Sequence, residues 1–321
     1  MQGIKRIIAL LLAVLVCMSA LAGCQQKTDA GNGGKLRVVA SIFPLYDWLR
    51  EILQDDPHVE LTLLLDNGVD LHSYQPTADD ILTIGQADLF VYVGGESDQW
   101  VRDAVNASAN PGQIAVSVLD ALGDAAKEEE TVEGMESEGD ADAALDEHVW
   151  LSLRNAAVLT NVLADKLAQL DGEHQAAYRA NAQAYRDKLT DLDGRYREAV
   201  AAAPHKVLLF GDRFPFRYLV DDYDLTYYAA FAGCSAETEA SFETVIFLAG
   251  KVDELGLSAI CQIETSDGAI ARTIRDATRT KDQALVTLDS LQSVTPDQIA
   301  GGTTYLGIME QNLTALTQAL Q

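Results

Sequence analysis

Cysteine is scarce in this sequence, with four residues in 321, and no two of them form a CxxC pair. So few cysteines exclude a fold built on disulfides, and the missing spacing argues against a thiolate zinc site or a thioredoxin-like motif. Hydrophobic residues make up 48% of the chain, enough for one large domain or two ordinary ones. A hydrophobic core must therefore hold the fold together, and long-range disorder is excluded.

Basic residues are also few. The chain has 23 Lys and Arg against 49 Asp and Glu, which gives a net charge of -26. Such a chain repels polyphosphates and anionic lipid surfaces. We therefore expect no nucleic-acid partner.

The amino terminus has the order of features found in an export signal. Lys5 and Arg6 precede an apolar stretch that ends in Leu-Ala-Gly and then Cys24. The stretch is too short for a membrane span and indicates a signal peptide, residues 1–23. Its end resembles a bacterial lipobox, which implies that Cys24 is lipidated and anchors the protein to the membrane outside the cytoplasm. The alternative is an ordinary signal peptide followed by a chance cysteine.

From residue 35 onwards, short β-branched runs alternate with helical patterns. Near-continuous apolar strands separated by helices predict a parallel sheet covered on both faces. We assign residues 24–170 to this first α/β lobe. Its expected strands are Leu36–Ala40, Val59–Leu65, Leu89–Val93 and Ile114–Val116, and its last helix is Arg154–Leu170. Ten acidic side chains crowd into residues 127–147, and such a run repels itself, which predicts a mobile loop that does not pack.

A long helical pattern separates this lobe from a second one. It occupies residues 171–203 and ends at Pro204. Thirty helical residues span roughly 45 Å, longer than one lobe needs, so the helix is predicted to link two lobes. The second α/β lobe, residues 204–321, has expected strands at Val207–Phe210, Leu225–Ala230, Ser258–Ile263 and Leu285–Leu288 and helices near Phe242–Leu255, Ala269–Thr278 and Tyr305–Leu320. Two such lobes favour a binding protein with its ligand in the cleft beyond the carboxyl ends of the strands.

Two of the five histidines stand in unusual surroundings. His72 follows the second strand in the sequence DLHSYQPTADD, and His148 follows the acidic run in DEHVWLSLRNA. A single histidine in a loop is usually a solvated surface group. The two segments together, however, resemble the paired motifs of the metal-binding lipoproteins of zinc and manganese ABC importers, the cluster A-I solute-binding proteins. The resemblance covers nearly all of residues 36–320, and the family fold is two α/β lobes joined by one long helix.

The resemblance implies a metal site shared by the two lobes. His72 and His148 would be imidazole ligands from the first lobe. Zinc members of the family often carry a third histidine in the second lobe, but the corresponding stretch, residues 211–218, has none. Asp212, expected at the end of its strand, could take that place or could instead act as a cap or an arginine partner. Arg213 cannot coordinate a metal.

A carboxylate after the strand Ser258–Ile263 is the remaining ligand that the family implies. We expect Glu264 to be this ligand and Asp267 to cap the following helix, although the reverse assignment remains open. Cys234 and Cys261 could form a disulfide in an exported protein, or stay as buried thiols, and a soft-metal role for Cys234 is conceivable. We assign neither as a ligand.

The expected cargo is Zn²⁺, with Mn²⁺ as the alternative, because imidazoles and carboxylates suit both ions and zinc binds such sites more tightly. The resemblance implies a monomer that delivers the ion to an ABC permease with its ATPase. The acidic loop, residues 127–147, should gather metal ions without forming the tight site, or else have no role. A hydrolase is disfavoured, because HExxH, HxxEH and GxSxG are all missing, and an adhesin would not need the paired histidines.

Overall fold

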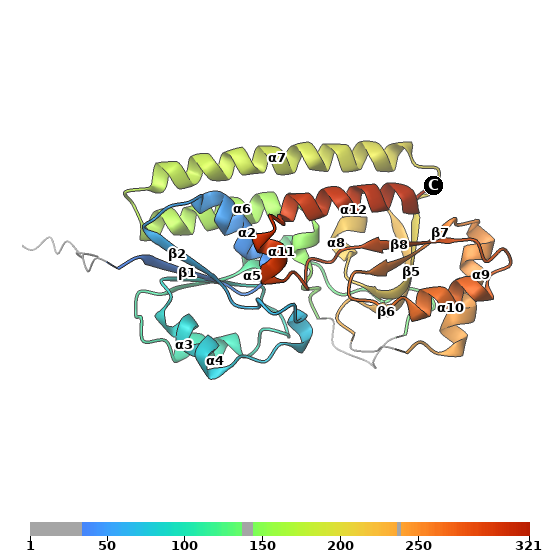
Figure 1. Ribbon diagram of the computed structural model, residues 1–321, viewed down its shortest axis with the longest axis horizontal. Helices are drawn as coiled ribbons and strands as arrows, with labels where there is room; N and C mark the ends of the chain where they lie inside the picture. The colour runs from blue at the N-terminus through green and yellow to red at the C-terminus, as the bar shows by residue number, and fades with distance from the viewer. Residues whose placement is uncertain (1–33, 137–143, 236–238) are drawn as a thin grey trace, which may run out of the picture. The chain divides into compact units, whose positions relative to one another are not determined.

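The computed structural model describes residues 34–136, 144–235 and 239–321 (Figure 1). The expected signal peptide and Cys24 lie outside these residues. Residues Leu36–Gln321 form one compact unit. Within the described ranges, no helix combines the length and the apolar character needed to cross a membrane.

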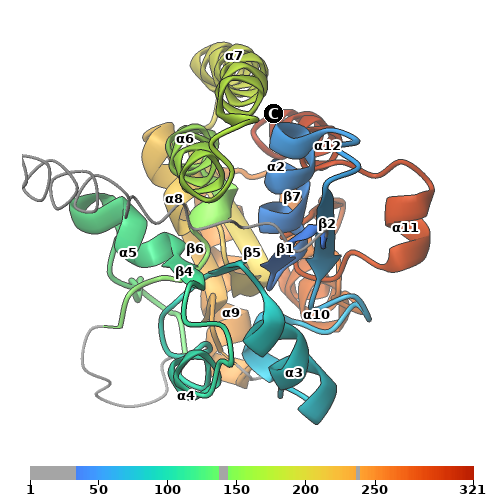
Figure 2. The ribbon, with the colours of Figure 1, turned by 90° about the vertical axis from the view of Figure 1, so that its left-hand side faces the viewer.

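The first sheet has four parallel strands, as the sequence predicts. Their order is β2-β1-β3-β4. The strands are β1 (Leu36–Ala40), β2 (Val59–Leu63), β3 (Leu89–Tyr92) and β4 (Ile114–Ser117). The helices of this half are α2 (Phe43–Leu53), α3 (Ala78–Gln86), α4 (Val101–Asn106), α5 (Val118–Leu122) and α6 (Leu153–Leu170), with 3₁₀ turns η1 (Leu71–Ser73), η2 (Gly123–Ala125) and η3 (Val149–Leu151). Figure 2 shows α2, α6 and α7 on one side of the sheet and α3 and α4 on the other.

The long linking helix is α7 (Gln175–Ala202), which runs past both sheets in Figure 1. It contacts α6 and α2 of the first half and α12 of the second. Its buried face repeats at helical spacing and consists largely of Tyr178, Ala182, Tyr185, Leu189, Leu192, Tyr196 and Val200. The helix ends before Pro204, where the sequence places its boundary.

The second sheet is also parallel and has the order β6-β5-β7-β8. Its strands are β5 (Val207–Phe214), β6 (Thr226–Ala232), β7 (Ala259–Ile263) and β8 (Ala284–Leu288), and its helices are α8 (Arg217–Asp222), α9 (Phe242–Leu255), α10 (Ala269–Ala277), α11 (Pro296–Ala300) and α12 (Tyr305–Ala319). The predicted fold class, two α/β lobes with parallel sheets and one long helix, is confirmed.

One strand boundary differs from the prediction and bears on the site. β5 continues to Phe214, four residues beyond the predicted end, because its pairing with β6 resumes at Arg213 after a register shift that follows Phe210. Asp212 therefore lies inside a strand at an irregularity and does not follow the strand. The expectation that it ends the strand is wrong.

The acidic run also differs from the prediction. Residues 127–136 do pack: the backbone N–H of Glu136 donates to the carbonyl of Ala230 in β6 at 2.9 Å, and Met135 is buried. The charge argument considered repulsion within the run and overlooked the donors of the second half, such as Arg217, which forms an ion pair with Glu130 at 3.3 Å. Only the described part of the run is concerned, because residues 137–143 lie outside it.

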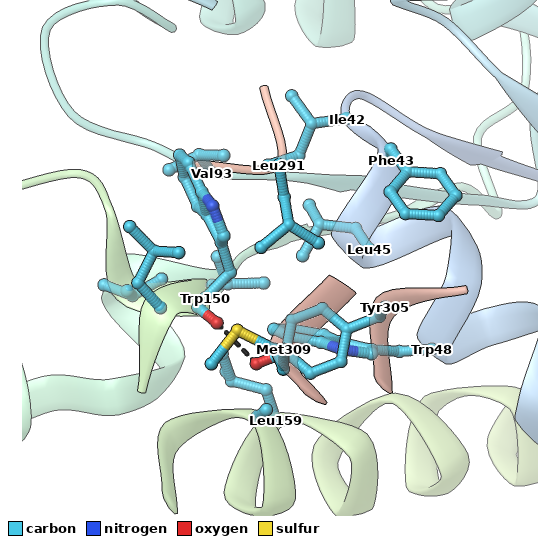
Figure 3. Close-up of a cluster of buried hydrophobic side chains, with 14 of the residues drawn as sticks. Ile42, Phe43, Leu45, Trp48, Val93, Trp150, Leu159, Leu291, Tyr305 and Met309 are labelled. Atoms are coloured by element: carbon cyan, nitrogen blue, oxygen red, sulfur yellow. Dashed lines mark hydrogen bonds between the residues drawn. The ribbon is translucent and has the colours of Figure 1, made fainter. Parts of the chain in front are cut away.

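A buried cluster joins the two halves close to His148 (Figure 3). The indole N–H of Trp150 donates to the carbonyl of Ser290 at 2.8 Å, and the hydroxyl of Tyr305 donates to the carbonyl of Trp150 at 2.6 Å. The Trp48 and Tyr305 rings meet edge to face with centroids 5.3 Å apart. Because Trp150 comes two residues after His148, this packing fixes the backbone that carries that histidine.

Candidate metal centre

His72 is positioned by the loop that follows β2. Asp70 caps the 3₁₀ turn η1, and one of its carboxylate oxygens accepts the backbone N–H of His72 at 3.0 Å. The imidazole Nδ1 lies 2.8 Å from the hydroxyl of Ser97 and 3.4 Å from Glu147 Oε2. The contacts of Nδ1 therefore orient the ring, and Nε2 is the nitrogen that can bind a metal ion.

His148 is held in the same manner and is fully buried. Asp146 Oδ1 accepts its backbone N–H at 2.8 Å and lies 3.0 Å from its Nδ1. Asp146 is itself 2% exposed, so the carboxylate cannot exchange this contact for water. A carboxylate that holds Nδ1 orients a histidine so that Nε2 can bind a metal.

The two imidazoles face each other through their Nε2 atoms. His72 Nε2 lies 3.0 Å from His148 Nε2. Zn–N bonds of about 2.0–2.1 Å at a tetrahedral angle would place the two nitrogens about 3.3 Å apart, so a small widening admits the ion. Burial and the charge of the neighbouring His148 lower the pKa of His72. Burial also acts to lower the pKa of His148, but the carboxylates of Asp146, Glu147 and Asp70 together raise that pKa overall.

A thiol from the second half completes the cluster. Within the described ranges, one group of three side chains that can bind metal has its donor atoms within 4.8 Å of one another: His72, His148 and Cys234. Cys234 follows β6 at the carboxyl edge of the second sheet. Gly233 brings the turn close to the imidazole, since a Cβ there would lie 3.0 Å from a ring carbon of His148. Burial, followed by the charge of Glu129, raises the pKa of the Cys234 thiol.

Sequence reasoning did not assign Cys234 as a ligand. The signal was its place in a Gly-Cys turn directly after an apolar strand of the second lobe, the edge at which parallel sheets bind ligands. Cys234 and Cys261 are both free thiols, so the disulfide that export would permit is not formed.

The two predicted carboxylate ligands are engaged elsewhere and are not part of this group. The Asp212 carboxylate accepts the backbone N–H groups of Arg213 at 2.8 Å and Ile263 at 3.3 Å, so it connects β5 to β7. Glu264 accepts from the backbone N–H and the hydroxyl of Ser290 at 2.7 and 2.8 Å and from the hydroxyl of Ser293 at 3.1 Å.

The N-cap of α10 is Gly268 and makes no side-chain cap bond, so the expectation that Asp267 occupies the cap position is wrong, although Asp267 lies one residue before it. Asp267 Oδ1 accepts the backbone N–H of Ala269, the first residue of α10, at 2.7 Å. This contact still occupies one Asp267 oxygen at the start of the helix, and Glu264 is the carboxylate that directly follows β7.

Arg213 links the second half to the first ligand loop. Its guanidinium lies 2.7 Å from Asp70 Oδ2, while the other oxygen of Asp70 holds the backbone of His72. Burial acts to raise the pKa of Asp70, but the charges of His72 and Arg213 lower it overall. Arg213 therefore connects β5 of the second half to the loop that carries His72.

Two parallel α/β sheets linked by one long helix, with imidazole and thiol donors contributed by both halves, define a metal-binding protein of the solute-binding class. The chain belongs to the ZnuA family, described as zinc-uptake complex component A, periplasmic, whose model matches residues 38–319. Members of this family are transport components, which leaves the hydrolase alternative without support.

Named relatives agree with this family. The chain is 31% identical over 318 residues to the zinc-binding lipoprotein AdcA of Streptococcus pneumoniae strain R6. This match covers 97% of this chain and 60% of that protein. The chain therefore spans about 60% of the length of AdcA. It is 29% identical to the high-affinity zinc uptake system protein ZnuA of Bacillus subtilis strain 168, with 97% of each chain covered.

Solved structures agree as well. The crystal structure of the metal-dependent lipoprotein YcdH from Bacillus subtilis has a TM-score of 0.73 and 28% identity, and the match covers 89% of this chain and 99% of that one. The Zn(II)-bound ZnuA-like domain of Streptococcus pneumoniae AdcA has a TM-score of 0.71 and 28% identity over the same shares.

Proposed function

We propose that this protein captures Zn²⁺ outside the cytoplasm and delivers it to an ABC permease for import. The observation that carries the proposal is the meeting of His72 Nε2 and His148 Nε2 at 3.0 Å with the Cys234 thiol in the same cluster. Two imidazoles and a thiolate are the donors that zinc prefers, whereas manganese prefers oxygen ligands. Cys234 thus favours zinc over the manganese alternative that imidazoles and carboxylates alone leave open.

The fourth coordination position belongs, in this proposal, to a carboxylate of the second half. We prefer Glu264 to Asp212, because two of the three bonds to Glu264 come from serine hydroxyls, which can turn to other acceptors. Asp212 holds only backbone N–H groups, and its release would leave two strands with unpaired donors. Glu264 would have to exchange its serine contacts for the ion.

The anchoring and delivery steps extend this proposal. Lipidation at Cys24 would hold the protein at the outer face of the membrane, and the lipoprotein names of several relatives support such an anchor. The family description as one component of an uptake complex supports a permease with its ATPase as the receiving partner. We propose that the carrier acts as a monomer.

Metal titration tests the proposed function. Metal-free protein should bind one Zn²⁺ tightly, keep its preference for Zn²⁺ in the presence of excess Mn²⁺, and show no hydrolytic turnover. His72→Ala should lose tight binding, while His205→Ala, a histidine outside the cluster, should behave as wild type. An unchanged dissociation constant in His72→Ala would refute the site, and tighter binding of Mn²⁺ would refute the choice of cargo.

A further inference from the structure

The described part of the acidic run, residues 127–136, which we name the acidic strap, begins beside the approach to His148. The backbone N–H of Glu129 donates to the carbonyl of Ala144 at 2.8 Å, and the N–H of Asp146 donates to the carbonyl of Lys127 at 2.8 Å. These bonds pair the start of the strap with the segment that leads into the histidine. The strap is thus connected to the first half of the metal centre through its backbone.

The other end of the strap lies against the second sheet. Glu136 forms a parallel bridge with Phe231 in β6, the edge strand, and its carboxylate accepts the backbone N–H of Ser241 at 2.6 Å. At the start of the strap, Lys127 also forms an ion pair with Asp221 of α8 in the second half at 2.6 Å. The strap therefore crosses from the first half to the second and is fixed on both sides.

Glu129 contacts the metal centre itself. Its Oε1 accepts the backbone N–H of Cys234 at 3.2 Å, so a side chain of the strap holds the residue that carries the thiol. The neighbouring acids differ: Glu128 is exposed, and the side chain of Glu130 pairs with Arg217. Glu129 alone of these three is directed at the ligand turn.

We infer that Glu129 is a positioning residue for the metal ligand Cys234 and that the acidic strap sets the distance between the thiol and the two imidazoles. The inference rests on the proposed function, because it presumes that Cys234 binds the ion. The turn at Gly233 and Cys234 packs against the His148 ring, and the hydrogen bond that the Cys234 backbone N–H donates to Glu129 holds it there. Acids of this run thus act through specific hydrogen bonds and ion pairs, whereas composition predicted a mobile loop that gathers metal ions.

Three variants of the full chain test the inference. Glu129→Ala removes the acceptor, Glu129→Gln keeps an oxygen at the same place, and Glu128→Ala removes an equal charge from an exposed neighbour. Zinc affinity is measured by competition with a chelator, and Co²⁺ loading reports the sulfur ligand through its sulfur-to-cobalt charge-transfer band. We expect Glu129→Ala to weaken zinc binding about tenfold and to reduce the band, since a hydrogen bond to a charged group is lost. Glu129→Gln and Glu128→Ala should stay close to wild type.

The outcomes separate this inference from the proposed function. If the wild-type Co²⁺ protein lacks the sulfur band, Cys234 is not a ligand and the inference falls, whereas zinc capture falls only if the metal-free protein fails to bind Zn²⁺. If Cys234→Ser abolishes the band while Glu129→Ala matches Glu128→Ala, the ligand set stands and the positioning role is overturned. Failure of Glu129→Gln to restore binding would also overturn it, because charge and not the hydrogen bond would then matter. Should Glu129→Ala fail to fold, Glu129→Asp carries the same test, because its shorter side chain does not reach the backbone N–H of Cys234.

Discussion

The two halves of the metal centre are held in different ways. In the first half, the carboxylates of Asp70 and Asp146 each hold a histidine two residues further along the same loop. In the second half, Cys234 is held by Glu129, and Arg213 is held by Asp70, so both contacts come from outside the second sheet. The two histidines are therefore held by carboxylates of their own half, whereas the contact that holds the thiol forms only when the halves are together.

Removal of a histidine should have the largest effect, because it disrupts the half whose ligands are held by its own carboxylates. His148→Ala takes away one ligand and the ring nitrogen that donates to the Asp146 carboxylate. We expect zinc affinity to fall by more than about 100-fold, which exceeds the loss usual for a residue that only supports a ligand. Isothermal titration calorimetry measures the change, with His174→Ala as the control. If the affinity falls no further in His148→Ala than in the control, the histidine pair is not the site.

Replacement of the thiol should have the next largest effect and should change selectivity. Cys234→Ser leaves both imidazoles in place, so we expect zinc affinity to fall roughly 50-fold, between the loss of a histidine and that of a supporting residue. The preference for Zn²⁺ over Mn²⁺ should shrink at the same time, because a soft donor is replaced by oxygen. Competition between the two ions measures the change, and Cys261→Ser, the other free thiol, is the matched control. An unchanged preference would contradict the role of the thiol.

Loss of a supporting carboxylate should have a smaller effect. Asp146→Ala leaves His148 present but removes the acceptor that orients its ring. We expect about a tenfold loss of zinc affinity, as for other residues that orient a ligand. Ser97→Ala, which removes a neutral partner of His72, should cost less because hydrogen bonds to ionised groups are stronger. If Ser97→Ala proved the more damaging, the carboxylate would not be the principal support of the first half.

The same difference between the halves explains what the sequence could predict. His72 and His148 were predicted because their two short segments resemble the paired motifs of a metal-binding family, and each segment also contains the carboxylate that holds its histidine. Cys234 was not assigned, because its partners Glu129 and His148 are remote along the chain and meet it only through the pairing of the strap with β6. Local pattern thus reveals a site whose geometry is set locally and misses one that is set by tertiary contacts.

The predictions for the end of β5 and for the acidic run were wrong for a related reason. The pattern could not show that β5 continues past a register shift to Phe214, because that extension depends on pairing with β6. The acidic strap was predicted to be mobile from its composition, but the fold brings Arg217 to Glu130 and pairs Lys127 of the strap with Asp221. The two parallel sheets and the long helix follow from the hydrophobic pattern and are confirmed by the structure, whereas the pattern does not give the order of the strands.

The contact between Arg213 and Asp70 offers the finest test of the difference between the halves, and its effect should be the smallest. The two side chains are 18% and 14% exposed, so the ion pair is partly screened by solvent. In Arg213→Ala, Asp70 can still cap η1, and the histidine pair should remain intact while the second half is held less firmly. We expect zinc affinity to fall only about threefold, with less dependence on salt than in wild type, because the lost interaction is the one that ions screen. Arg275→Ala, which removes an equal charge from α10, should change neither quantity. A loss as large as that of His148→Ala would mean that Arg213 supports the first half directly, and the two halves would then be equally dependent on each other.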